Sequence, residues 1–151
     1  MIKEFQGEYR WLSNMWRIEP FTHEGITYDT TEAFYVSMKT TDIAEREKIA
    51  KMNPYEAKKY GGARANNIVL RSDWDSKTRI MYMTIALDYK FSQPKMQELL
   101  LATGTQEIVE GNWWGDTFWG ICNGKGSNHL GKLLMQKRAE LASNKLFTVA
   151  D

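Results

Sequence analysis

A single apolar stripe near the middle of the chain constrains the fold more than any other feature. Ile80, Met83, Leu87 and Phe91 recur at intervals of three and four residues, so their side chains share one face of a helix. An amphipathic helix of this length must bury its apolar face against other elements. We therefore predict that the segment beginning near Asp75 forms the central helix of the core.

Helix-start signals before this stripe predict three short helices, the first of them over residues 31–39. Each start places a capping residue ahead of a helix-forming run, and two of them add a glutamate at capping-box spacing. The predicted starts are Asp29 with Glu32, Asp42 with Glu45, and Asn53 with Pro54, and the third helix ends at Gly61-Gly62.

The remaining segments predict a small sheet and two further helices. A β-hairpin is expected around the turn His23-Glu24-Gly25, a short strand over 106–111, and helices over 94–104 and 128–142. The chain has 151 residues and no linker-like stretch, which fits one domain over residues 1–151. The predicted fold class is α+β, a helix-dominated single domain with a small antiparallel sheet.

Charge and cysteine content exclude several classes of protein. Twenty Lys and Arg residues oppose 19 Asp and Glu, so the net charge of +1 gives no global field that would attract nucleic acid or an anionic membrane. Cys122 is alone and there are two histidines, which leaves no disulfide and no closed structural zinc site. Neither a signal peptide nor a membrane span is recognisable. We predict a cytoplasmic protein with no membrane partner, metal or cofactor.

The segment TTEAFYVSMK is the first candidate for chemistry. Glu32, Tyr35 and Lys39 are three and then four residues apart, so a carboxylate, a phenol and an amine project from one helical face. Spacing alone favours a solvated face with a surface ion pair of little energetic value.

The second candidate is Asp116, which stands among tryptophans in GNWWGDTFWG. Burial beside apolar rings favours the protonated form of a carboxyl group and would suit Asp116 to general-acid work. Gly115-Asp116 is also ordinary turn chemistry, so a simple turn explains the pattern equally well.

The third candidate is the glycine-rich segment CNGKGSNHLG, which runs directly into a predicted helix. Such a loop could offer backbone N–H groups and a positive helix end to a phosphate. Gly124, Gly126 and Gly131 do not have the spacing of a dinucleotide-binding fingerprint. A plain loop with Ser127 or Asn128 as the helix cap is the alternative.

Two further pairs of residues could contact a nucleotide. Arg10 and Asn14 stand among aromatic residues in GEYRWLSNMW, where Arg could hold a phosphate and Asn could read a base or a ribose hydroxyl. Trp74 and Lys77 could cover a base and contact an anion. The alternatives are an edge strand with polar surface residues, and a packed ring beside a snorkelling lysine.

Taken in order, these segments resemble the NADAR (YbiA-like) family from Gly7 to about Leu141. The matching residues are GEYRWLSNMW, Tyr28, TTEAFYVSMK, Ala57-Lys58, Gly61, Trp74, Lys77, Lys90-Phe91, Leu100, Thr103-Gly104, Asp116, Phe118-Trp119-Gly120, Gly126 to Gly131, Leu134-Met135 and Arg138. The chain departs from the common family pattern at Trp11, Met15 and Ala33, which puts substrate preference in doubt more than reaction type.

The resemblance implies an N-glycosidase that acts on phosphoribosylamino-pyrimidine intermediates of riboflavin synthesis or removes ADP-ribose from modified guanine. It implies Glu32, Lys39 and Asp116 as catalytic residues. The implied substrate-binding residues are Arg10, Asn14, Tyr35, Trp74, Trp119, Gly126 and Asn128.

Cleavage of a bond between an anomeric carbon and nitrogen builds positive charge on the sugar. Glu32 could stabilise that charge or activate water while Asp116 protonates the leaving nitrogen, with both carboxylates in one pocket. Alternatively, Lys39 could capture the opened sugar as a Schiff base. The rival functions are a non-catalytic module that binds ADP-ribose or a nucleotide, and a structural adaptor with an aromatic surface. ADP-ribosylated nucleic acid stays open as a partner, since Lys58, Lys59, Arg64 and Arg71 could form a local basic face.

Overall fold

The computed structural model describes the main chain of residues 1–150 and the side chains of residues 1–144. The chain divides into two compact units, which are described separately. One unit is Trp11–Tyr89, and the other joins Met1–Arg10 to the chain from Lys90 onward. The prediction of one domain over the whole length therefore stays a prediction.

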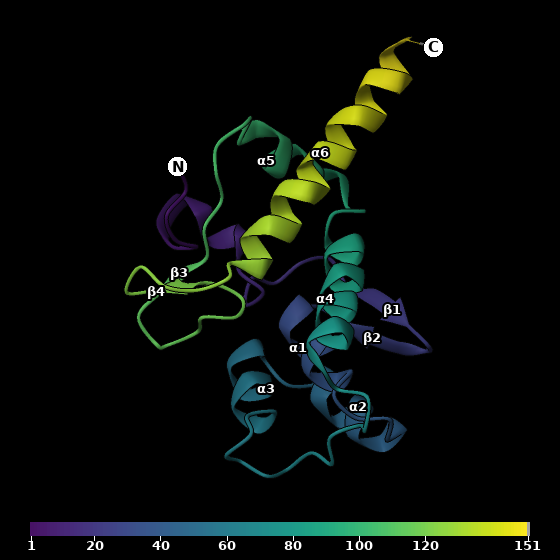
Figure 1. The fold of residues 1–151 in the computed structure, drawn as a ribbon. Coiled ribbons are helices and arrows are strands. Elements are labelled where there is room, and N and C mark those ends of the chain that lie inside the picture. Colours follow the sequence, from purple (N-terminus) through teal and green to yellow (C-terminus); the bar gives the residue numbers. More distant parts are fainter. Residues whose placement is uncertain (151) are drawn as a thin grey trace. The chain divides into compact units, whose positions relative to one another are not determined.

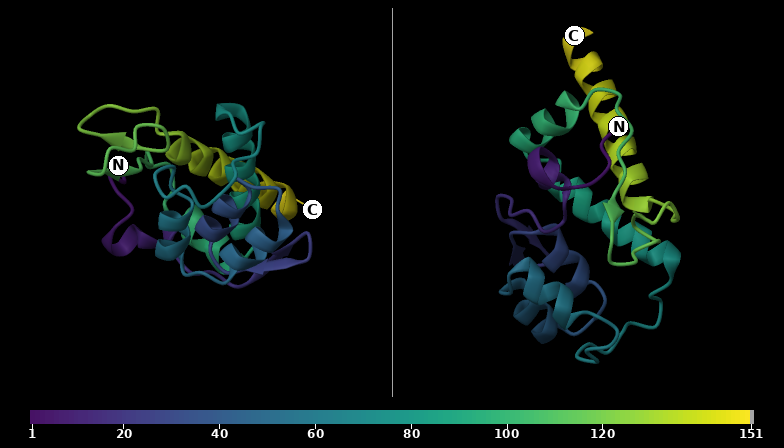
Figure 2. Two further views of the ribbon diagram at one scale, coloured as in Figure 1. Left: turned by 90° about the horizontal axis from the view of Figure 1, so that it is seen from below. Right: turned by 90° about the vertical axis from the view of Figure 1, so that its left-hand side faces the viewer.

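The Trp11–Tyr89 unit is built around three short helices and a hairpin (Figure 1). Its elements are β1 (Phe21–His23), β2 (Ile26–Tyr28), α1 (Thr31–Ser37), α2 (Ile43–Ala50), α3 (Pro54–Tyr60) and most of α4 (Ser76–Lys90). Helix α1 packs against α2, α3 and β2, and the views in Figure 2 show the three short helices side by side. The three predicted short helices and the long helix are confirmed.

The predicted hairpin is also confirmed, with a two-residue turn. Phe21 pairs with Tyr28 and His23 with Ile26 in antiparallel register. Glu24 and Gly25 between them both have positive φ, 49° and 81°, as a type I′ turn requires.

Aromatic packing around α1 forms the core of this unit. Phe34 is fully buried, and its ring centroid lies 5.5 to 5.8 Å from those of Phe21, Tyr28 and Tyr89. Most of these contacts are edge-to-face, which the ring quadrupoles favour. Every residue of α1 except Glu32 is buried. The helix is therefore an interior element that leaves one acidic side chain only partly covered.

The first turn of α1 is capped by Thr30, and the prediction of Asp29 as the cap is wrong. The Thr30 hydroxyl oxygen accepts the Ala33 N–H at 3.1 Å, and the Thr30 side chain is buried. Asp29 instead forms a surface ion pair with Arg17. Asp29 and Thr30 are both residues that can cap a helix, so the sequence does not distinguish them. The path of the chain out of β2 decides which of the two side chains faces the first turn of α1.

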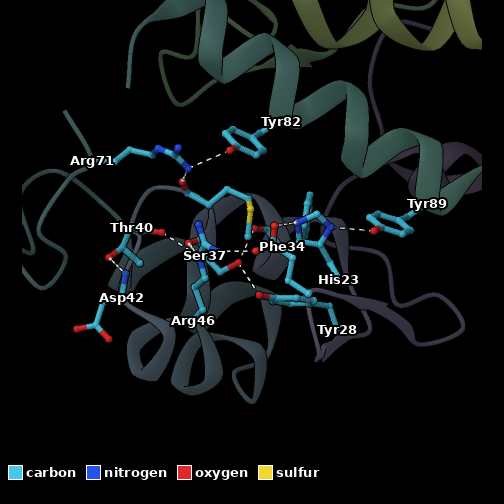
Figure 3. Close-up of polar contacts among 12 residues, drawn as sticks. His23, Tyr28, Phe34, Ser37, Thr40, Asp42, Arg46, Arg71, Tyr82 and Tyr89 are labelled. Carbon is cyan, nitrogen blue, oxygen red and sulfur yellow. Dashed lines mark hydrogen bonds and ion pairs between the residues drawn. The ribbon is translucent and has the colours of Figure 1, made fainter. Parts of the chain in front are cut away.

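Two arginines satisfy the carbonyl groups at the other end of α1 (Figure 3). Arg46 Nε donates to the carbonyl oxygens of Ser37 and Thr40, at 3.3 and 2.9 Å. Arg71 Nη1 donates to the carbonyl oxygen of Met38 at 3.2 Å. The last carbonyls of a helix lack partners within it and carry partial negative charge, so guanidinium groups stabilise this end.

The second unit contains α5 (Pro94–Ala102) packed against α6 (His129–Ala150), together with the short strands β3 (Gly111–Asn112) and β4 (Ile121–Cys122). Helix α6 is longer than predicted. The strand predicted over 106–111 is wrong: Ile108 makes only an isolated bridge with Ile2, and β3 pairs with β4 in parallel. The 3₁₀ helix η1 (Gly7–Leu12) was not predicted either.

The helix-dominated α+β class with a small antiparallel sheet is confirmed. Within the described residues, no helix is both long and apolar enough to cross a bilayer.

The Thr30 cap can be tested by substitution. Thr30→Ala leaves the Ala33 N–H without its acceptor, and we expect it to lower the free energy of unfolding by about 1 kcal/mol. Asp29→Ala removes only the surface pair with Arg17, so it should cost clearly less. Urea denaturation of both variants measures the difference, and an Asp29→Ala cost equal to or above that of Thr30→Ala would contradict the assignment.

Candidate active site

Helix α1 carries the polar row predicted from the sequence. Glu32 lies in its first turn and is half-buried, while Lys39 follows the capping residue Met38. Tyr35 lies between them with 6% of its surface exposed. A solvated face would expose the phenol, so that simpler interpretation of the spacing is wrong.

Asn14 fixes the start of α1 and thereby the position of Glu32. Its carbonyl oxygen accepts the Glu32 N–H at 3.1 Å, and its side-chain Oδ1 accepts the Thr31 hydroxyl at 2.9 Å. Its amide nitrogen donates to Met83 Sδ on α4 at 3.4 Å. Asn14 is buried, and these bonds give it a positioning role at the predicted site.

Lys39 is held beside the C-terminal end of α3. Its Nζ donates to the Gly61 carbonyl oxygen at 2.9 Å, and its own carbonyl oxygen accepts the Arg71 N–H at 2.8 Å. A Cβ atom at position 61 would collide with the Val36 side chain, so glycine there allows α3 to end against α1. This close approach brings the Gly61 carbonyl to the lysine.

The surroundings of Lys39 lower its pKa from the ordinary 10.5. Burial is the largest cause, because desolvation disfavours the ammonium form. The charge of Glu32 opposes the shift and the charge of Arg79 adds to it. A lysine in this environment is a better nucleophile near neutral pH than a surface lysine.

Aromatic rings and Arg79 surround the middle of this polar row. The Tyr35 ring lies 5.5 Å from Trp74, whose ring stacks on Tyr82 at 6.1 Å, and Lys39 Nζ is 5.9 Å from the Tyr35 ring centroid. Arg79 Nε donates to the Tyr35 hydroxyl oxygen at 3.3 Å. Five predicted residues thus belong to the same unit: Asn14, Glu32, Tyr35, Lys39 and Trp74.

Arg79 was missed by the sequence analysis. It lies 40 or more positions beyond the α1 residues, and nothing in its spacing links it to them. The only signal is its place in the first turn of α4, on the helix that the apolar stripe predicts.

Asp116 belongs to the other unit and organises its own loop. Its Oδ1 accepts the N–H groups of Phe118 and Trp119, at 3.1 and 2.9 Å. The Asn112 side chain accepts from the Asp116 N–H and donates to the Asp116 carbonyl oxygen, at 3.0 and 2.8 Å. These four hydrogen bonds agree with the turn interpretation of Gly115-Asp116, because the Asp116 side chain and main chain both hold the loop together.

The glycine-rich loop could have formed a phosphate cradle with the N–H groups that open α6. The structure uses those N–H groups in another way. The amides of Ser127, Asn128, His129 and Leu130 donate in turn to the carbonyl oxygens of Thr117, Gly120, Phe118 and Trp119, at 2.8 to 3.3 Å. The preceding loop therefore caps the helix, and these four donors are used within the protein.

Asn128 and Gly126 have structural roles in the same loop. Asn128 is buried, its Nδ2 donates to the Ile108 carbonyl at 3.0 Å, and its Oδ1 accepts the Glu110 N–H at 2.9 Å. Gly126 has φ of 146°, and a Cβ atom there would collide with the Gly120 carbonyl. Their predicted part in substrate binding stays a prediction.

The remaining predicted residues differ in exposure. Trp119 is buried, with its ring 4.8 Å from Phe118, whereas Arg10 is exposed in η1. Across the part of the chain that the structure describes, no cluster of three His, Cys, Asp or Glu residues could hold a metal ion.

Comparison with known proteins identifies the class. The sequence matches the NADAR domain over residues 2–142. The chain belongs to the NADAR domain family.

Particular members of the family are similar over most of this chain. N-glycosidase YbiA of Shigella boydii is 37% identical over 129 residues, which cover 83% of this chain and 78% of that protein. The chloroplastic riboflavin biosynthesis protein PYRR of Zea mays is 37% identical over 127 residues, 76% of this chain and 20% of that protein. The NMR structure of the E. coli protein YbiA superposes with a TM-score of 0.79 at 32% identity, covering 97% of this chain and 89% of that one. The predicted reaction class, a hydrolase of N-glycosyl bonds, is confirmed by these relatives.

Two glycine-to-alanine substitutions test whether tight packing, in addition to backbone conformation, requires a glycine at position 126. A Cβ atom at position 124 would have no other atom within 4 Å. Gly124→Ala should still cost about 1 kcal/mol of stability, because the φ of 76° is strained for any residue with a side chain. Gly126→Ala adds a collision with the Gly120 carbonyl and should cost at least 1 kcal/mol more. Thermal or chemical unfolding measures both, and equal costs would contradict the tight packing at Gly126.

Proposed function

We propose that the protein hydrolyses the bond between ribose C1′ and the amine nitrogen of a phosphoribosylamino-pyrimidine, with Lys39 and Glu32 as its reactive groups. The relative named as a riboflavin biosynthesis protein supports this substrate class, a small molecule of that pathway. The observation that carries the proposal is the partly buried Lys39, which donates to the Gly61 carbonyl and whose pKa is lowered by burial although the charge of Glu32 opposes that shift.

The chemistry follows from the ease with which a glycosylamine opens to an imine. The C1′–O4′ bond opens as O4′ takes up a proton, which leaves a protonated imine at C1′. The neutral Lys39 amine adds to C1′, one of its protons passes to the pyrimidine nitrogen, and the bond from C1′ to that nitrogen breaks, so that a protonated Schiff base links Lys39 to the ribose phosphate. Water then adds to C1′, the bond to Lys39 breaks, and ribose 5-phosphate is released with the free amine. Glu32 is suited to accept and return the proton, and its charge stabilises the cationic intermediate.

Asp116 remains a predicted catalytic residue. In the rival route, Glu32 stabilises an oxocarbenium-like sugar or activates water, and Asp116 supplies the proton to the leaving nitrogen. Asp116 Oδ1 already accepts two main-chain N–H groups of its own loop, so the local geometry gives more support to the lysine route.

ADP-ribosylated guanine is the second candidate substrate. Lys58 and Lys59 on α3 and Arg64 in the loop after it are exposed, in the segment whose Gly61 carbonyl contacts Lys39. Exposed basic side chains suit the phosphates of ADP-ribose or of a nucleic acid that carries it.

The lysine route predicts a trappable intermediate. Borohydride added during turnover should reduce the Schiff base and leave ribose phosphate on Lys39, detectable by peptide mass spectrometry. Lys39→Arg keeps the positive charge but cannot form the intermediate, so turnover should fall by at least about 100-fold. Glu32→Gln should also slow turnover by about 100-fold or more while still permitting slow trapping.

The controls distinguish the rival functions. Asp116→Asn should keep most of its activity in the lysine route and lose it in the carboxylate route. A panel of phosphoribosylamino-pyrimidines and ADP-ribosylated guanosine identifies the substrate by release of ribose phosphate or ADP-ribose. Binding without release would indicate a non-catalytic module, and near wild-type turnover in Lys39→Arg would exclude the lysine route.

A further inference from the structure

Arg79 enters the polar row of α1 from a different element. It lies in the first turn of α4 and is half-buried, and its Nε donates to the Tyr35 hydroxyl oxygen at 3.3 Å. Tyr35 is in turn packed between Trp74 and the Lys39 ammonium group, at 5.5 and 5.9 Å. The Arg79 guanidinium therefore bonds the same Tyr35 side chain whose ring the Lys39 amine faces.

The charges that face Lys39 come from several elements. On α1 these are the Glu32 carboxylate and the Tyr35 phenol, on α4 the Arg79 guanidinium, and at the end of α3 the Gly61 carbonyl. Glu32 favours the ammonium form of Lys39, and Arg79 opposes it as a like charge. Burial is the largest cause of the lowered pKa of Lys39, and the charge of Arg79 adds to it by opposing part of the effect of Glu32.

The other nearby arginine cannot replace Arg79 in this role. The Arg71 guanidinium is paired with Asp73, at 2.6 and 3.2 Å, so its charge is largely neutralised. Its remaining contacts are the Met38 carbonyl and the Tyr82 hydroxyl, which fix the end of α1 and an aromatic ring.

We propose that Arg79 is a positioning residue of this site: its guanidinium holds the Tyr35 hydroxyl, and with it the ring that Lys39 Nζ faces, and it places a second positive charge close to the Lys39 amine. The proposal rests on the proposed function of Lys39 as nucleophile. It assigns to Arg79 an effect on the protonation of Lys39 and on the packing of Tyr35, with no contact to the reacting atoms.

The protonation of Lys39 can be measured without any substrate. Reductive methylation with ¹³C-formaldehyde labels the lysines, and NMR titration then gives the pKa of Lys39, with Lys39→Arg identifying its signal. In Arg79→Gln we expect this pKa to rise, because the like charge is gone and Glu32 remains. Arg79→Lys, which restores the charge, should return it most of the way to the wild-type value.

The pH profile of turnover supplies the second measurement. The rising limb of kcat/KM should move to higher pH by the same amount in Arg79→Gln, which gives a loss below the limb and recovery above it. Arg17→Gln removes an exposed arginine of the same unit and should leave both measurements unchanged. Circular dichroism and unfolding of each variant show whether it is folded.

Two results would overturn the proposal. One is a folded Arg79→Gln variant in which the Lys39 pKa and the limb stay at their wild-type positions. The other is a loss of turnover that is the same at every pH, which would give Arg79 a purely structural role. If Lys39→Arg were active and no adduct could be trapped, the proposed function itself would fail, whereas the titration would still report on Arg79.

Discussion

The candidate site depends on how the two ends of α1 are held. A seven-residue helix is too short to be stable alone, and its terminal N–H and carbonyl groups need partners outside it. Thr30 and Asn14 supply them at the start, and the guanidinium groups of Arg46 and Arg71 supply them at the end. Because both ends are fixed, the carboxylate at one end and the amine beyond the other have defined, partly buried positions in their unit.

Reactivity in such a site comes from a balance between burial and charge. Burial favours the neutral amine of Lys39, the Glu32 carboxylate favours the ammonium, and the Arg79 guanidinium opposes the carboxylate. An amine fully paired with a carboxylate would stay protonated, and one buried with no charge nearby would have no proton acceptor. With all three groups present, the proposed nucleophile Lys39 has the proposed proton carrier Glu32 within electrostatic reach. Lys90, by contrast, is fully buried and burial alone lowers its pKa to about 7.

Local patterns in the sequence predicted the elements that depend on local physics. The hairpin turn at Glu24-Gly25, the Asp42 and Asn53 caps and the common face of Glu32 and Tyr35 were read correctly because each is set within a few residues. The choice of Thr30 over Asp29 failed because it depends on the direction in which β2 delivers the chain. The same limit explains why the strand predicted over 106–111 is wrong: Ile108 forms an isolated bridge with Ile2, and Gly111 pairs with Ile121 instead.

The roles predicted for the site residues stay predictions. Helical spacing predicted that Glu32 and Tyr35 lie on one helix with Lys39 near its end, but the contact of Arg79 with Tyr35 depends on how α4 packs beside α1. The use of the loop amides between Ser127 and Leu130 was also beyond the sequence, because their acceptors come from the loop between β3 and β4. A glycine-rich segment before a helix shows that donors exist without showing which acceptor they meet.

The bonds that fix Glu32 and Lys39 end on main-chain atoms: the Asn14 carbonyl, the Arg71 amide and the Gly61 carbonyl. Most amino acids carry such atoms, although position 61 needs a glycine to bring its carbonyl to Lys39. Substitutions at other neighbouring side chains therefore need not move Glu32 and Lys39. An identity of 37% with a relative is compatible with this kind of anchoring. The surrounding side chains can diverge while the positions of Glu32 and Lys39 are kept.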